Sequence, residues 1–229
     1  IEAVLEHIAR TLGRSLEDIR AVNYYGTTDR NVTPYEQVVK DNIIVELSAR
    51  LRAEIDFDGM SRAVEEFNAS HETLKKGLAL MPVKFGISFN TPKLNQAGAL
   101  VHVYTDGSVH LNHGGTEMGQ GLFTKVAQVV ASTFQIDLDN IKISATRTDK
   151  VPNTSATAAS SGSDLNGMAA LNAAEIIKGR MGDVAAGHFG VDRDKIEFRA
   201  NRVYAGNESV SFSELAQMTY DERQSLSAA

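Results

Sequence analysis

The sequence predicts an α+β fold, in which a helical segment over residues 1–76 precedes a domain over residues 77–229 that has a mixed sheet with helices packed on one face. Three observations support this prediction. Apolar residues recur at helical spacing up to about residue 76, the period then changes to the alternation of strands, and an Asp-Gly turn joins two strand-like runs. Strands and helices without strict β-α-β alternation are typical of this fold class.

Four helices are expected in the first segment. The first ends at Gly13, and the second follows Ser15, which resembles the first residue of a capping box. The third carries apolar residues from Ile43 to Leu51 on one side, and the fourth starts after Asp58.

The second segment opens with a predicted strand in which apolar residues alternate from Leu78 to Phe89. A hairpin of residues 100–104 and 109–113 follows, and its Asp106-Gly107 turn is the strongest hairpin signal in the chain. The remaining elements are expected in this order: a glycine-rich stretch that opens a helix ending near Phe134, a short strand at 141–143, a small-residue tract, a long helix from Asp164, a hairpin around Asn201, and a last helix capped by Ser213.

The composition is that of an ordinary globular protein and excludes several classes of function. The 229 residues are 42% hydrophobic, and 23 Lys and Arg against 29 Asp and Glu give a net charge of −6. This balance argues against nucleic acids and anionic membranes as partners, because both need a basic surface. No apolar run approaches the roughly 18 residues of a membrane span, and a cytoplasmic location is expected. The absence of cysteine excludes disulfides, thiolate zinc sites and iron–sulfur ligation by this chain.

The two ends of the sequence indicate a larger parent polypeptide. The chain begins at Ile1 inside a helical pattern, without an initiator methionine, and it ends at Ala229 without a closing signal. We therefore expect it to be an internal fragment.

Two stretches are poor in side chains. Residues 114–121 contain four glycines between a strand and a helix, so they form either an anion site or merely a tight turn. They are not a phosphate-binding loop of the Walker type, because Leu122 stands where that motif has its lysine. Residues 151–162 carry almost no bulky side chain, so either a ligand packs against their backbone or another part of the protein covers them.

Other side chains offer weaker signals. Phe85 and Phe89 share one face of the predicted strand and serve either the core or the stacking of a flat ligand. His110 and His113 face opposite sides of their strand and make a poor metal site. Glu117 is either a general base or a carboxylate stabilised by the start of the following helix, and the second interpretation is the plainer one.

Four blocks of sequence, in a fixed order, together carry a resemblance to a known family. They are the runs Lys84 to Phe89, Leu94 to Ser108, His113 to Gly121, and Val151 to Gly167. In this order they resemble the molybdenum-cofactor domain of the xanthine dehydrogenases, within the xanthine dehydrogenase and aldehyde oxidase family. The first block favours xanthine dehydrogenase over aldehyde oxidase. The resemblance implies the molybdopterin-binding domain fold of that family.

The resemblance also implies an activity and its cofactors. Such enzymes of purine catabolism hydroxylate xanthine or hypoxanthine with an oxygen atom derived from water, at a molybdenum held by a molybdopterin. Electrons then pass to iron–sulfur clusters and FAD, which lie on other domains or subunits of a dimeric parent enzyme. The flavin part decides between NAD and oxygen as acceptor.

The resemblance assigns roles to individual residues. Substrate contacts are implied for Phe89 and for Asn90, which stands where the family usually has threonine. Ala159 is expected beside the molybdenum without ligating it through its side chain. The expected cofactor-binding residues are Gly115, Gly119, Gln120, Gly121, Ala158, Ala159, Ser160 and Gly162.

No catalytic residue is expected in this chain, because the segments that carry the family's glutamate base and substrate-gripping residues do not occur in it. The 229-residue chain alone is therefore predicted to be inactive and to hold the cofactor only weakly. Two alternatives remain. One is a catalytically inert binding or scaffold domain of the same fold. The other is a nucleotide-phosphate binder that uses residues 114–121, and the missing lysine disfavours it.

Overall fold

Local capping sets the ends of the first helices. Helix α1 (Glu2–Leu12) ends at Gly13, whose φ of 61° lies in the left-handed region. Helix α2 (Leu16–Val22) starts after Ser15, whose hydroxyl accepts a hydrogen bond from the Asp18 amide at 3.0 Å. These two helices confirm the sequence prediction.

The next two helices are α3 (Ile44–Glu54) and α4 (Phe57–Ser70), and α3 buries none of its side chains. Helix α4 starts two residues earlier than expected, because Asp56 rather than Asp58 is its cap and accepts a hydrogen bond from the Gly59 amide.

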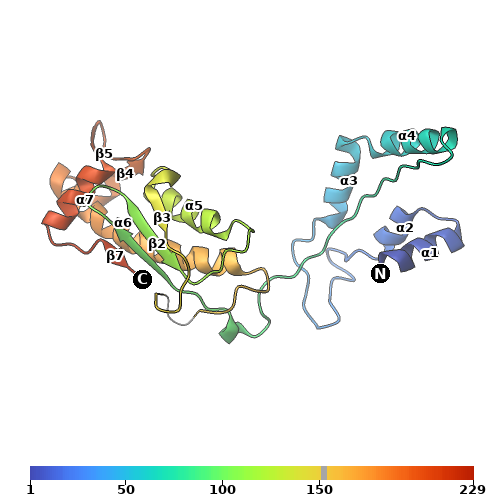
Figure 1. Ribbon diagram of the computed structural model, residues 1–229, viewed down its shortest axis with the longest axis horizontal. Coiled ribbons are helices and arrows are strands. Elements are labelled where there is room, and N and C mark those ends of the chain that lie inside the picture. Colours follow the sequence, from blue (N-terminus) through green and yellow to red (C-terminus); the bar gives the residue numbers. More distant parts are fainter. Residues whose placement is uncertain (151–153) are drawn as a thin grey trace. The chain divides into compact units, whose positions relative to one another are not determined.

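This computed structural model describes residues 1–150 and 154–229, and it divides into two compact units, residues 1–85 and 86–229 (Figure 1).

A buried arginine holds the first unit together. The Arg20 guanidinium donates to the Glu2 carboxylate at 2.7 and 2.9 Å and to the Leu80 carbonyl at 2.8 Å. The extended chain after α4 is thereby tied to the first two helices.

The predicted strand from Leu78 to Phe89 is wrong, because this segment is extended but pairs with no strand in the part of the chain that the structure describes. Val83 and Phe85 are 75% and 69% exposed. Alternating apolar residues indicate an extended backbone, but they do not supply a neighbouring strand. The backbone amide of Ser88 instead donates to the Ala159 carbonyl at 2.9 Å.

The main sheet of the second unit has the order β3-β2-β1-β7 and is mixed. Strands β1 (Ala99–Val103) and β2 (Val109–His113) form the predicted antiparallel hairpin, while β3 (Ile141–Ile143) runs parallel to β2. The last strand, β7 (Ser227–Ala228), pairs antiparallel with β1. In β1, residues 99, 101 and 103 are buried whereas Leu100 and His102 are not, so one face of the sheet is covered.

Two helices cover that face. Helix α5 (Leu122–Phe134) contributes Val126, Val130 and Phe134 to the core. Helix α6 (Gly162–Phe189) lies against α5 and the sheet (Figure 1), and its alanines allow a close approach. Its fully buried residues include Ala170, Ala173, Ala174 and Ile177. The predicted mixed sheet with helices on one face is confirmed.

A small antiparallel sheet of β4 (Ile196–Arg199), β5 (Arg202–Ala205) and β6 (Glu208–Ser211) precedes helix α7 (Phe212–Asp221). The cap of α7 is Ser211, in a capping box with Glu214, and not Ser213 as predicted. In the described parts of the chain, three short 3₁₀ turns complete the elements, at Pro92–Leu94, Leu138–Asn140 and Arg193–Lys195. Among the described residues, no helix combines the length and apolar character needed to cross a bilayer.

Candidate functional site

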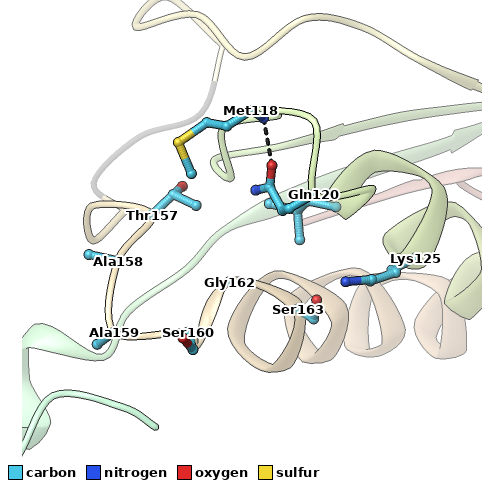
Figure 2. A pocket seen from close by; sticks show the side chains of 10 residues that line it. Met118, Gln120, Lys125, Thr157, Ala158, Ala159, Ser160, Gly162 and Ser163 are labelled. Carbon is cyan, nitrogen blue, oxygen red and sulfur yellow. Dashed lines mark hydrogen bonds between the residues drawn. The ribbon is translucent and has the colours of Figure 1, made fainter. Parts of the chain in front are cut away.

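A cavity of about 430 Å³ lies in the second unit, between the glycine-rich loop, the small-residue loop and the first turns of α5 and α6 (Figure 2). Its lining brings together two segments that are distant in sequence, so Gln120 and Ala159 face one common space. The described residues that line it are Met118, Gln120, Leu122, Lys125, Thr157, Ala158, Ala159, Ser160, Gly162 and Ser163.

The glycine-rich loop is organised around the carboxylate of Glu117. This group accepts hydrogen bonds from the backbone amides of Phe123 at 2.9 Å, Gly119 at 2.8 Å and Gly121 at 3.1 Å. The Phe123 amide, followed by the other amides, holds the pKa of Glu117 below its ordinary value of 4.5. The loop therefore contains its own anion, which favours the tight turn over the anion site. A carboxylate that is stabilised in this way is a weak base.

Gln120 lies in the same loop, and both the oxygen and the nitrogen of its side-chain amide form hydrogen bonds within that loop. Its Oε1 accepts from the Met118 amide at 2.6 Å, and its Nε2 donates to the Thr116 carbonyl at 2.9 Å (Figure 2). A primary amide has two N–H groups and two oxygen lone pairs, so one of each remains for a ligand. Gly119 and Gly121, with φ of 93° and 76°, provide the left-handed conformations that the turn requires.

The small-residue loop is fastened to the glycine-rich loop. The Thr116 amide donates to the Thr157 hydroxyl at 2.8 Å, and a Cβ on Gly114 would overlap the side chain of Thr154. A glycine is therefore required where the two loops meet. Val151, Pro152 and Asn153, which open this block of sequence, lie outside the described residues.

The same loop is also fastened to the segment before the sheet. The Ser155 amide donates to the Gln96 carbonyl at 2.9 Å, and the Ala159 carbonyl accepts from Ser88. The four blocks of sequence that carry the family resemblance thus have members in contact within the second unit.

The backbone of the small-residue loop presents hydrogen-bond donors. Ala159 and Ser160 both adopt left-handed conformations, with φ of 53° and 54°, which are unusual for residues with a side chain. No described residue accepts a hydrogen bond from the amides of Ala158, Ala159 or Ser160. With small side chains, these amides can approach the polar edge of a ligand directly.

His113 is buried next to the glycine-rich loop and is hydrogen-bonded to it. It is 1% exposed, its Nδ1 accepts from the Gly115 amide at 3.1 Å, and its ring meets the Phe123 ring edge-on at 5.1 Å. Burial lowers the pKa of His113, so the neutral ring is favoured. In the described part of the chain, no group of three His, Cys, Asp or Glu residues could hold a metal ion.

The structure separates the predicted site residues into two groups. Gln120, Ala158, Ala159, Ser160 and Gly162 line the cavity. The others do not: Gly119 and Gly121 shape the turn, Gly115 approaches the side chains of Leu122 and Asn166, Phe89 is half-buried and bonded through its backbone to Asn95, and Asn90 is exposed.

Sequence reasoning missed five of the described lining residues, which are Met118, Leu122, Lys125, Thr157 and Ser163. The helical spacing of Lys125 from Gly121 could have placed it near the loop, because residues three and four apart share a helix face.

The chain matches the model of a molybdopterin cofactor-binding domain over residues 50–229. The chain belongs to this family. Among curated relatives of this domain, it is 48% identical over 184 residues to xanthine dehydrogenase 1 of Arabidopsis thaliana, covering 80% of this chain and 13% of the relative. It is 42% identical to xanthine dehydrogenase of Dictyostelium discoideum, covering 98% and 15%. A nicotinate hydroxylase of Emericella nidulans is 46% identical, with 79% and 13% covered. The chain thus spans about 15% of the length of such relatives.

Solved structures share the fold of this molybdopterin cofactor-binding domain. Quinoline 2-oxidoreductase from Pseudomonas putida 86 superposes with a TM-score of 0.74 at 18% identity, over 99% of this chain and 31% of that chain. The Cu,Mo-CO dehydrogenase gives a TM-score of 0.69 at 21% identity, over 100% and 31%. The predicted fold type is therefore confirmed.

The residues of the cavity fit a molybdopterin. This group is a flat pterin with many hydrogen-bonding edges, a dithiolene that holds the metal, and a phosphate ester. The cavity offers backbone amides that have no acceptor among the described residues, a Gln120 amide with one N–H and one lone pair still available, and small side chains over residues 158–163. Backbone donors without bulk suit such an edge, and the dithiolene makes thiolate ligands from the protein unnecessary.

Proposed function

We propose that this chain forms one wall of the molybdenum-cofactor site in a hydroxylase that oxidises xanthine or hypoxanthine. The observation that supports it is the common cavity of Gln120 and Ala159. When bound, the cofactor supplies the metal for transfer of a water-derived oxygen atom and takes up the two electrons released by the substrate.

The residues of this chain bind and orient in this proposal. The remaining N–H and lone pair of Gln120 pair with the pterin, and the amides of Ala158 and Ser160 pair with its polar edge. The methyl group of Ala159 leaves room for the coordination sphere of the metal. Gly119 and Gly121 hold the turn that presents Gln120.

The substrate side of the proposal rests on Phe89 and Asn90. The backbone amide and carbonyl of Phe89 bond to the Asn95 side chain at 3.1 and 2.8 Å, and Ser88 next to it bonds to Ala159. This connection holds the segment next to the loop that carries Ala159. Stacking of Phe89 on a purine would be worth about 1 kcal/mol beyond area burial.

The remainder of the enzyme belongs to other parts of the assembly. Iron–sulfur clusters and FAD on other domains or subunits receive the electrons, the parent enzyme is a dimer, and its location is cytoplasmic. Support for a larger assembly comes from the length of the relatives, of which this chain spans about 15%.

The chain alone is inactive in this proposal, and one observation favours that view. Among the described lining residues there is no His, Asp or Glu that could act as general base. A catalytically inert binding domain of the same fold would present the same cavity.

A fluorescence titration of the full 229-residue chain tests cofactor docking. The probe is the dephosphorylated, fluorescent pterin obtained by oxidation of molybdopterin. We expect weak, saturable binding. Gln120→Ala should raise the Kd about tenfold, because the loss of one hydrogen bond of about 1.4 kcal/mol corresponds to a tenfold change in Kd. Gln128→Ala, on an exposed position of α5 outside this cavity, is the control. No saturable binding, or equal losses in both variants, would refute the proposal.

A further inference from the structure

A groove of about 800 Å³ lies in the first unit. Helix α3 contributes to one of its walls, and residues 80–84 of the extended chain after α4 contribute to another (Figure 1). The charged side chains among its described lining residues balance in sign; they are Glu2, Lys40, Asp41 and Lys84. No net charge attracts an ion to the groove, so its lining suits an apolar occupant.

The helical wall carries exposed apolar side chains. Leu47 and Leu51 are four residues apart, so they share one face of α3, and both line the groove. Leu47 is 55% exposed, and α3 buries none of its side chains in this structure. A helix in a folded protein normally packs its apolar face against another element. Apolar side chains that are exposed along one groove are typical of an interaction site.

The extended wall has backbone groups that are available for pairing. The Leu80 carbonyl accepts from the Arg20 guanidinium at 2.8 Å, and Pro82, which has no N–H, lies on the same side of the extended chain. The backbone groups of Met81 and Val83 point to the opposite side. No described residue forms a hydrogen bond with them. Unpaired donors and acceptors along an extended chain are a template for a strand of another segment.

The length of the relatives indicates a source for such a strand. This chain spans about 15% of the xanthine dehydrogenase of Dictyostelium discoideum. A parent polypeptide of that length has most of its residues outside this chain. A segment of the same polypeptide docks without the entropy cost of bringing two molecules together, so a short stretch of pairing is sufficient. A second copy of the chain would have to overcome that cost.

We propose that the groove is the docking site of an extended apolar strand from a part of the parent polypeptide outside this chain. The strand pairs with the backbone of Met81 and Val83, and its alternate side chains pack against Leu47 and Leu51. Main-chain hydrogen bonds supply affinity in this mode, and the side chains supply specificity. The inference rests on the larger assembly of the proposed function but not on cofactor binding.

The experiment uses overlapping fluorescent peptides that tile the rest of the parent polypeptide. Each is titrated against the full 229-residue chain, with fluorescence anisotropy as the readout. We expect a peptide with alternating apolar residues to bind saturably. Leu47→Asp should raise its Kd about tenfold or more, because a charge would be buried in an apolar contact. Val45→Asp is the matched control, since Val45 lies on the same helix and is 60% exposed but does not line the groove.

Hydrogen exchange tests the strand pairing itself. When the peptide binds, the amides of Met81 and Val83 should exchange more slowly, whereas the Lys84 amide, on the other side of the chain, should not. Val83→Pro removes one N–H and should raise the Kd about tenfold. Val83→Ala keeps that N–H and should lose less affinity. Because Leu47, Val45 and Val83 are exposed, their variants should unfold at the same temperature as the unsubstituted chain.

The outcomes separate this proposal from its alternatives. Absence of peptide binding, or equal weakening by Leu47→Asp and Val45→Asp, overturns it. Self-association of the chain in sedimentation experiments that Leu47→Asp abolishes would assign the groove to a second copy, which also overturns it. Equal protection of the Met81, Val83 and Lys84 amides contradicts strand pairing. The pterin titration reports separately on the proposed function, because none of these residues lines the cavity of the second unit.

Discussion

The Glu117 carboxylate accepts a hydrogen bond from the Phe123 amide at 2.9 Å, and it thereby closes the turn between strand β2 and helix α5. The group that sequence reasoning weighed as a general base is part of the architecture of the loop. Its charge orders the amides that precede and begin the helix, and Gln120 is presented to the cavity as a result.

Glu117→Gln should weaken pterin binding although the side chain does not line the cavity. The neutral amide accepts less strongly from three backbone donors, so the loop and Gln120 become less ordered. The measurement is the pterin titration, with Glu175→Gln on the exposed side of α6 as the matched control. Unchanged binding in Glu117→Gln would show that the loop holds its shape without the charge.

The contribution of Glu117 to the free energy of unfolding should decrease as the pH falls. Its pKa is lowered in the folded chain, so the unfolded state binds the proton more readily. The stabilisation is complete above 4.5, the ordinary value, and is lost as the pH falls through the folded pKa. Urea titrations from pH 7 to pH 3 should show the parent chain and Glu117→Gln converging in free energy of unfolding. A constant difference over that range contradicts the expectation.

His113 should lower the free energy of unfolding at a pH above the range in which Glu117 acts. Its folded pKa lies below the ordinary value of 6.5 because burial disfavours the charged ring. The unfolded state therefore binds more protons, and the free energy of unfolding decreases as the pH drops from 6.5 toward the folded pKa. His113→Asn keeps an acceptor for the Gly115 amide but does not titrate, so its stability should vary less between pH 7.5 and pH 5.5. If both proteins respond equally, the titrating group is elsewhere.

Gly114→Ala should disrupt the contact between the glycine-rich loop and the small-residue loop. The added methyl group would overlap Thr154, so the small-residue loop must move and pterin binding should weaken. Gly179→Ala is the control, because its methyl group meets nothing within 4 Å inside α6. That variant should be more stable by about 0.5–1 kcal/mol, since alanine favours helix over glycine. Thermal unfolding and the pterin titration together separate the two effects.

The core between α6 and the sheet can be probed with two adjacent residues. Ile177 is 0% exposed and Ile176 is 45% exposed. Ile177→Ala should lower the free energy of unfolding by about 2–5 kcal/mol, because it leaves a cavity among packed side chains. Ile176→Ala should cost much less. Similar losses of both variants in urea titrations would contradict the packing of α6 with Ile177 inside and Ile176 outside.

The elements that the sequence predicted best are those with a local cause. The Asp106-Gly107 turn and the alternation in β1 and β2 defined the hairpin, because both act within a few residues. The extended run from Leu78 to Phe89 showed the same alternation but no strand, since pairing depends on a partner that the run itself does not encode.

The site was predictable in part for the same reason. The absence of bulk in residues 114–121 and 151–162 is visible in the sequence, and it singled out the two loops that meet at the cavity. The role of Glu117 inside its loop is a matter of hydrogen bonds between residues two to six apart, whose geometry spacing alone does not determine. The position of Lys125 in the wall of the cavity depends on how α5 packs on α6, which is a tertiary property.

The two hydrogen bonds that Gln120 makes to its own loop have a consequence for ligand affinity. A glutamine that becomes ordered loses about 1.5–2 kcal/mol of rotational freedom. Here that loss occurs during folding and not on association. A ligand therefore contacts a side chain that is already ordered. The free energy of each new hydrogen bond to Gln120 is not reduced by the cost of ordering that side chain.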